Sequence, residues 1–218
     1  MSAMATEATD REGIRTALIE AAAKLIAGEG PSALTLRRVA DDVGTSTMAI
    51  YTGFGGMPEL RRAVRHEGFD RLASELARAD ETDDPVADLW MLGALYYANA
   101  VRDPDLYRVA FMEQPLDRAD VMAGTEAFKS LTAGVERCIA SGRFAAAADA
   151  AELATEFWAL GHGVIALQLA QVLAPDEAAG CLDRGVRRLL EGWGDDPAAV
   201  DRSLRDARAR AQRALARA

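Results

Sequence analysis

Hydroxyl and guanidinium side chains gather in one short stretch of the chain, residues 34–52. The candidates are Thr35, Arg37, Arg38, Thr45, Ser46, Thr47, Met48, Tyr51 and Thr52. Arginine and small hydroxyl side chains bind phosphate oxygens, and hydroxyls also hydrogen-bond to base edges. Met48 can make only apolar contacts, for example with a thymine methyl group. Side chains of these types could contact the backbone and bases of a nucleic acid.

The sequence gives less support to a catalytic site or a metal site than to nucleic-acid binding. The chain has two histidines, His66 and His162, and the sequence predicts no metal site around either. No glycine-rich phosphate loop follows a strand, because no strand is predicted, and no Ser–His–acid or Cys–His set stands at a suggestive spacing. We therefore predict a protein that is not an enzyme and uses no cofactor. An all-α enzyme is the least supported alternative.

Two short helices joined by a tight turn must position the polar side chains. Thr35 is a good N-cap for the first helix, and Gly44 ends that helix where a left-handed residue is needed. Ser46 caps the second helix, and Ile50 is its buried anchor. The result is a helix-turn-helix unit whose second helix is small and polar enough to enter a major groove. Spacing alone does not separate this hypothesis from a plain αα-corner in a helical bundle.

The same stretch resembles the DNA-binding domain of the TetR (tetracycline-repressor-like) family of bacterial transcriptional regulators. The resemblance covers about residues 11–65, with two departures: Gly53 replaces the family's usual histidine and Met57 its usual lysine. Since that lysine typically binds a DNA phosphate, its loss predicts a salt dependence of affinity that is shallower by about one unit of slope. The matching positions are Thr35, Val39, Ala40, Gly44, Ser46, Ile50, Tyr51, Phe54 and Leu60.

The resemblance implies a role for each polar candidate. Thr35, Arg37 and Arg38 would hold phosphates, and the later candidates would meet bases or backbone. Double-stranded operator DNA would be the partner of a homodimer, because paired recognition helices must reach successive major grooves. The favoured function is a repressor that a small, mostly apolar effector releases from its operator. A helical ligand-binding or interaction protein that has lost operator binding is the alternative, motivated by Gly53 and Met57.

Helical patterns continue through the rest of the chain. Abundant alanine, sparse β-branched residues and the absence of alternating segments predict an all-α fold. We expect an N-terminal three-helix helix-turn-helix domain over residues 1–57. A larger helical domain for ligand binding and dimerisation follows over residues 58–218, with residues 58–79 as the connecting helix. The predicted helices cover residues 12–27, 35–43, 46–52, 58–79, 85–102, 104–113, 117–140, 145–173, 176–192 and 198–217.

Large aromatic and apolar side chains concentrate in the second domain. A solid core and a ligand cavity have the same composition, and the family resemblance favours the cavity. Trp158, His162 and Gly163 resemble the Trp…His-Gly motif of a WHG-type C-terminal subclass, and His162 is either a ligand contact or a hydrogen-bonding partner between helices. The predicted pocket residues are Trp90, Tyr97, Phe111, Phe128, Leu131, Trp158 and His162. The predicted dimer interface comprises Phe157, Val164, Leu182, Val186 and Leu189, on helices with apolar stripes.

The net charge of −9 argues at first against a nucleic-acid partner. By segment, residues 81–197 carry 9 basic and 20 acidic groups, net −11, whereas residues 31–65 carry 5 basic and 3 acidic groups, net +2. The acidity therefore belongs to the predicted ligand and dimer half. Residues 198–218, with 6 basic and 2 acidic groups, are expected to clamp that acidic half.

Two further features bear on the compartment. Cys138 and Cys181 are expected to be buried thiols rather than a disulfide. The uncharged stretch 157–175 has no positive flank, so we interpret it as a helix buried in protein. With no signal peptide in the sequence, a cytoplasmic protein without a membrane partner is expected.

Overall fold

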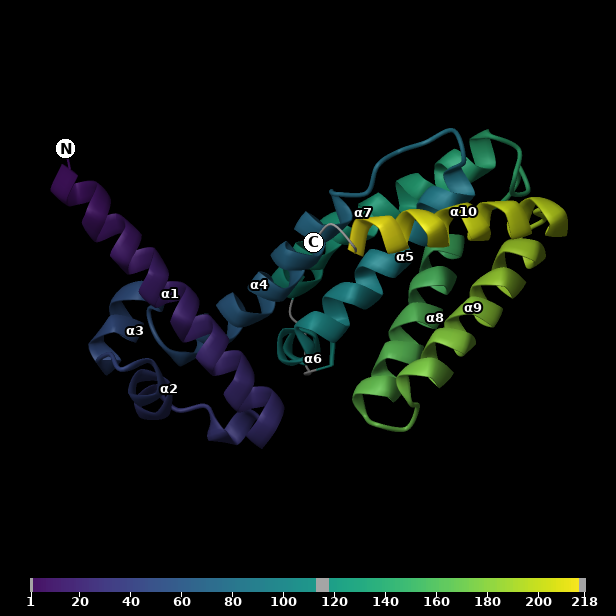
Figure 1. Ribbon diagram of the computed structural model, residues 1–218. Helices are drawn as coiled ribbons and strands as arrows, with labels where there is room; N and C mark the ends of the chain where they lie inside the picture. Colours follow the sequence, from purple (N-terminus) through teal and green to yellow (C-terminus); the bar gives the residue numbers. More distant parts are fainter. Residues whose placement is uncertain (1, 113–117, 216–218) are drawn as a thin grey trace. The chain divides into compact units, whose positions relative to one another are not determined.

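The computed structural model describes residues 2–112 and 118–215, and it confirms the all-α prediction. Helices joined by turns and loops make up these ranges, with no strand among them (Figure 1). The helices are α1 (Ser2–Glu29), the short 3-10 helix η1 (Pro31–Ala33), α2 (Leu36–Val43), α3 (Thr47–Phe54), α4 (Met57–Leu76), α5 (Pro85–Arg102), α6 (Pro104–Phe111), α7 (Arg118–Ala140), α8 (Ala150–Leu169), α9 (Pro175–Gly192) and α10 (Pro197–Leu215).

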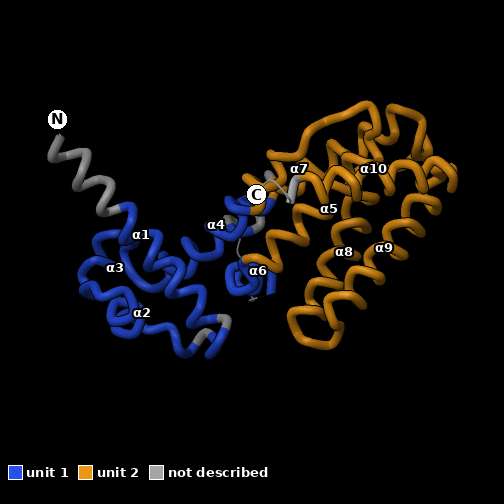
Figure 2. The backbone as a smooth tube through the Cα atoms, in the orientation of Figure 1, with its two compact units in different colours: residues 1–71, 103–124 blue, residues 72–102, 125–218 orange. Residues whose placement is uncertain are grey.

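The chain divides into two compact units (Figure 2). Unit 1 contains residues 1–71 and 103–124, and unit 2 contains residues 72–102 and 125–218. The boundary does not follow a single cut in the sequence, because α6 and the start of α7 belong to unit 1. The functional division at residue 57 stays a prediction.

The core of unit 1 is built from α1, α2, α3, α4 and α6. Leu18 and Ile19 of α1 pack with Ile50 of α3, and α6 adds Leu106 and Val109 to the same cluster. Apolar residues three and four positions apart give each of these helices one face to bury. A helix from the middle of the chain thus completes the hydrophobic core beneath the helix-turn-helix segment.

Gly68 lets α4 and α6 approach closely within unit 1. A Cβ atom at this position would lie 2.8 Å from the Cβ of Ala110 and 3.2 Å from the backbone oxygen of Leu106. Neither neighbour is a flexible side-chain end, so any side chain here would push the two helices apart.

In unit 2, α8 and α9 lie side by side and α10 runs along α5 (Figure 1). Two networks of charged groups fasten α10 and the connector before α5. In the first, Asp88 accepts hydrogen bonds from Arg137 (3.0 Å), Arg210 (2.8 Å) and Thr82. Burial alone would raise the pKa of Asp88, but its hydrogen bonds to Thr82 and the two arginines lower it below the usual value.

The second network centres on Arg143, whose guanidinium binds the buried carboxylate of Asp195 with two hydrogen bonds of 2.6 and 2.7 Å. Arg143 also contacts Asp84 at 3.3 Å, and the Ser203 hydroxyl of α10 donates to Asp84 at 2.7 Å. Of the basic residues in the described part of α10, Arg208 pairs with Asp183 and Arg210 with Asp88, so the expected contact with the acidic half is confirmed for these two.

The helix predicted from residue 145 begins later, so that boundary was wrong. Residues 145–149 form turns, and the Asp149 side chain caps α8 by accepting from the backbone N–H groups of Ala151 and Glu152. Alanine content indicated a helix here, but an Asp N-cap satisfies the exposed N–H groups only if the helix starts after it.

The remaining expectations concern the thiols and the uncharged stretch. Both cysteines are free; Cys138 is buried, which raises its pKa to about 12, and Cys181 is half-buried. The interpretation of residues 157–175 as a buried helix was wrong for its second half, since α8 ends at Leu169 and Val172 is 65% exposed. Among the described residues, no helix has both the length and the apolar composition of a membrane span.

Candidate nucleic-acid interface

The helix-turn-helix segment has the local geometry that its sequence predicts. The Thr35 hydroxyl caps α2 by accepting from the backbone N–H of Arg38 at 3.3 Å. Gly44 ends α2 in the left-handed region, with φ 72° and ψ 32°, where a β-branched residue would be strained. Ser46 stands at the N-cap position of α3, but the prediction that it caps the helix was wrong, because its side chain makes no capping hydrogen bond. Its hydroxyl is therefore not committed to the cap.

One face of α3 is exposed and the opposite face is buried. Ile50 is 0% exposed and packs into the core of unit 1, whereas Met48 is 67% exposed. Tyr51, Thr52 and Thr47 are also exposed, and Thr45 in the preceding turn is half-buried. The structure thus places the α3 candidates on an outward surface. Their contacts with DNA stay a prediction.

The two arginines of α2 are exposed but already paired. Arg37 lies 3.7 Å from Asp41 of the next turn. Arg38 is held more firmly, since its guanidinium makes hydrogen bonds of 2.8 and 3.3 Å with Glu29 and lies 3.9 Å from Asp42. A phosphate would therefore compete with carboxylates for Arg38. The sequence alone did not reveal this competition.

The residue at the family's lysine position does not face solvent as a charged group would. Met57 is half-buried and packs against the hydrophobic core of unit 1. Phe54 is also partly buried against this core, and the Arg15 guanidinium lies 5.1 Å from its ring centroid. The substitution at residue 57 thus adds apolar packing where the family pattern has a charge.

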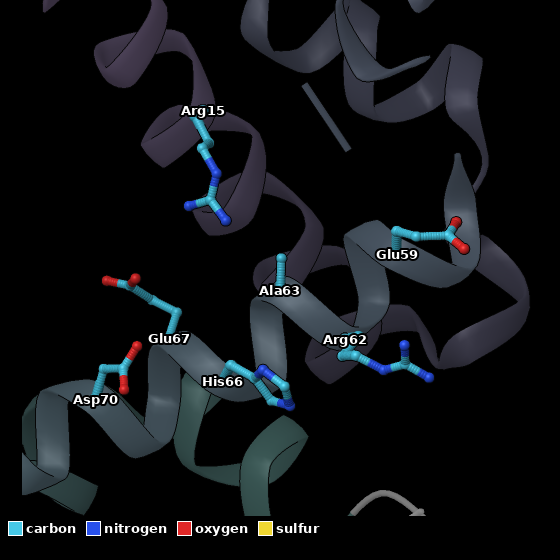
Figure 3. Close-up of a pocket in the computed structure, with 7 residues that line it drawn as sticks. All are labelled: Arg15, Glu59, Arg62, Ala63, His66, Glu67 and Asp70. Atoms are coloured by element: carbon cyan, nitrogen blue, oxygen red, sulfur yellow. The ribbon is translucent and has the colours of Figure 1, made fainter. Parts of the chain in front are cut away.

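A polar groove of about 300 Å³ lies between α1 and α4 in unit 1 (Figure 3). Figure 3 shows Arg15 on α1 and charged side chains of both signs along α4. A small, mostly apolar effector would not match this lining. The lining residues are Arg15, Glu59, Arg62, Ala63, His66, Glu67 and Asp70.

A buried acid that sequence reasoning missed lies close to this groove. Asp120 of α7 is almost fully buried and forms an ion pair with Arg65 of α4. Its other carboxylate oxygen lies 3.2 Å from Nε2 of His66, so this histidine, which lines the groove, also contacts the buried acid. Across the described residues, no group of three potential ligands could hold a metal ion.

Part of the predicted effector pocket forms a hydrogen-bonded chain in unit 2. Trp158 Nε1 donates to the Tyr96 hydroxyl at 3.1 Å, and that hydroxyl lies 3.3 Å from Nδ1 of His162. Burial lowers the pKa of His162, which favours the neutral ring. Tyr97 donates to Gln168 at 2.6 Å, also between α5 and α8. The polar groups of the Trp…His-Gly motif therefore link two helices, as one of the two hypotheses for His162 expects.

The other predicted pocket residues are distributed between the units. Trp90, Phe128 and Leu131 belong to unit 2, on α5 and α7. Phe111 belongs to unit 1, where its ring packs edge-on against Phe69 with centroids 5.2 Å apart. The contact with Phe69 therefore explains the position of the Phe111 ring without a bound ligand.

The predicted interface residues are largely covered within the chain itself. Phe157, Val164 and Val186 are buried, and a Cβ on Gly93 of α5 would meet the Phe157 ring at 3.0 Å. Leu182 and Leu189 are half-buried. At the end of α8 and in the turn after it, Leu167 and Val172 are 44% and 65% exposed. The open apolar surface is therefore displaced from the predicted residues, and the interface itself stays a prediction.

A capped helix-turn-helix on a hydrophobic core, followed in sequence by a larger helical region, is the architecture typical of helix-turn-helix DNA-binding proteins. A family model described as "Bacterial regulatory proteins, tetR family" matches residues 18–64. Another, described as "Tetracyclin repressor-like, C-terminal domain", matches residues 89–189 and spans the Trp…His-Gly motif. The HTH-type transcriptional regulator Rv0681 of Mycobacterium tuberculosis is 30% identical over 181 residues, which cover 82% of this chain and 80% of that protein.

Solved structures show the same fold. The fatty acid degradation regulator FadR from Bacillus halodurans superposes with a TM-score of 0.71 at 16% identity, covering 84% of this chain and 97% of that one. RolR in complex with resorcinol gives a TM-score of 0.60 at 18% identity, covering 90% and 95%. The chain belongs to the TetR family of bacterial transcriptional regulators. It is therefore a DNA-binding regulator and not an enzyme.

Proposed function

We propose that this regulator is a homodimeric repressor whose α3 helices enter successive major grooves of an operator. The observation that carries the proposal is the outward face of α3, with Thr47, Met48, Tyr51 and Thr52 exposed over a fully buried Ile50. Thr35, Arg37 and Arg38 would hold phosphates beside the groove, with Thr45 and Ser46 at the turn. Residues 1–57 would act as the DNA-binding domain.

The proposal is tested by binding to duplexes from upstream of the chain's own gene, at several salt concentrations. Sequence-specific retention at low salt is expected, and Arg37→Ala should flatten the plot of log affinity against log salt by about one unit per half-site. If no duplex is retained specifically while ligands still raise the melting temperature, the alternative function, a ligand-binding protein without an operator, is supported instead.

Replacing Glu29 by glutamine should strengthen DNA binding. The substitution removes the carboxylate that holds Arg38 at 2.8 Å and leaves only the more distant Asp42, 3.9 Å away, to compete with a phosphate for this guanidinium. Because both partners are about half exposed, the gain is limited to about fivefold. Fluorescence anisotropy with a labelled duplex measures it. Glu20→Gln, at another exposed glutamate of α1 whose arginine partner is Arg71, is the matched control and should leave the affinity unchanged. Unchanged affinity in E29Q would show that Arg38 does not bind phosphate.

For the effector, we propose a small, mostly apolar molecule bound in unit 2 near Trp90, Tyr97, Phe128, Leu131 and the Trp158–His162 motif. Aromatic faces with a few hydrogen-bonding groups suit such a ligand. The family neighbours support the general idea, since one was solved with resorcinol and another regulates fatty acid degradation. Binding would release the operator, and loss of DNA retention on adding a panel of phenols and fatty acids tests it.

A double substitution at exposed apolar residues should separate the homodimer. Leu167→Glu with Val172→Glu places two charges on surface that is open in the single chain, so folding should persist while association fails. Size-exclusion chromatography with light scattering is expected to give the monomer mass. Val101→Glu, at an exposed apolar residue of α5, is the control and should remain dimeric. A dimer that survives the double change would place the interface elsewhere.

A further inference from the structure

The exposed face of α3, with the turn before it, would meet the bases of the operator. It contains no side chain of the types that make a bidentate contact with a base. Arginine and lysine pair in this way with guanine, asparagine and glutamine with adenine, and acidic residues accept from cytosine. Residues 45–54 contain none of these types. The polar groups that remain are the hydroxyls of threonine, serine and tyrosine, which fit several bases and discriminate poorly.

One strongly exposed side chain of this surface is apolar. Met48 is 67% exposed, whereas Ile50 of the same helix lies in the hydrophobic core and Phe54 packs against it. Thr52 is four residues further on and exposed, so its methyl group lies on the same face. In the major groove, the C5-methyl group of thymine is the feature that an apolar side chain can recognise.

We propose that Met48, with Thr52 beside it, reads thymine C5-methyl groups, so that the operator half-sites of this regulator are specified by thymine methyls rather than by guanine contacts. The inference rests on the proposed DNA-binding function and names the base chemistry that this function uses. Helix α3 has eight residues, about 12 Å in length, and so covers about three or four base pairs of each half-site.

The experiment starts with duplexes enriched by the full-length chain from a randomised library. Each thymine of the half-sites is then replaced by deoxyuridine, which removes only the C5-methyl group. At one or two positions per half-site, affinity should fall by about fourfold, the ratio expected for burial of one methyl-sized group, and by about fifteenfold when both half-sites are changed. At the same positions, 5-methylcytosine should bind better than cytosine.

The Met48→Ala variant assigns the effect to its side chain. This variant should bind the thymine duplex more weakly and lose its sensitivity to deoxyuridine, whereas Met112→Ala, at an exposed methionine outside the helix-turn-helix, should behave like the parent chain. Specific binding that is indifferent to deoxyuridine at every position would overturn the inference and leave the proposed function intact. A library from which no sequence is enriched would overturn both.

Discussion

Replacing Asp195 by asparagine should lower the free energy of unfolding of unit 2 by about 3 kcal/mol. The Asp195 side chain is 1% exposed and binds Arg143 through both carboxylate oxygens. The substitution keeps the size of the side chain but removes its charge, which leaves the guanidinium with the more distant Asp84. Removal of one partner from a buried ion pair costs more than the pair itself contributes, because the remaining charge stays desolvated.

Urea unfolding followed by tryptophan fluorescence measures this loss. All three tryptophans, Trp90, Trp158 and Trp193, belong to unit 2, so the signal reports that unit. Asp201→Asn is the matched control, since the same change there breaks an ion pair with Arg187 whose side chains are both more than a third exposed, and the expected loss is below about 1 kcal/mol. Equal losses in the two variants would show that burial does not decide the contribution of Asp195.

Replacing Ile50 by alanine should destabilise unit 1 by about 3 kcal/mol and abolish most DNA binding. Ile50 is fully buried at the centre of the cluster to which α1, α2, α4 and α6 all contribute. Shortening it removes apolar contacts and leaves a cavity that the surrounding helices fill only in part. Since α3 is held in place mainly by this anchor, the loss should affect specific and non-specific duplexes alike.

Hydrogen exchange of peptides covering residues 34–60 measures the effect, because unit 1 contains no tryptophan. Amide protection in α2 and α3 should fall by about a hundredfold, the ratio that corresponds to 3 kcal/mol. Met48→Ala lies on the exposed face of the same helix and should change protection less than about threefold. If both variants lost protection equally, α3 would not be anchored through Ile50.

Local signals in the sequence determined the helix-turn-helix. The Thr35 cap, the left-handed Gly44 and the inward position of Ile50 depend on neighbours within a few residues, and the structure has all three. Cap residues and glycines report backbone geometry directly, so they can be recognised in one dimension. Local signals also gave a wrong helix boundary at residues 145–149. Alanine propensity favoured a helix there, but the Asp149 cap requires that the helix begin after it.

Only the tertiary structure decided which distant groups meet. The sequence places no constraint on the pairing of Asp195 with Arg143, 52 residues apart, or of Asp88 with Arg210, 122 residues apart. It also did not show that α6 completes the core of unit 1, that Phe111 packs there, or that Glu29 holds Arg38. Helical periodicity says which face of a helix is buried, but the partner of that face depends on packing between segments remote in the chain.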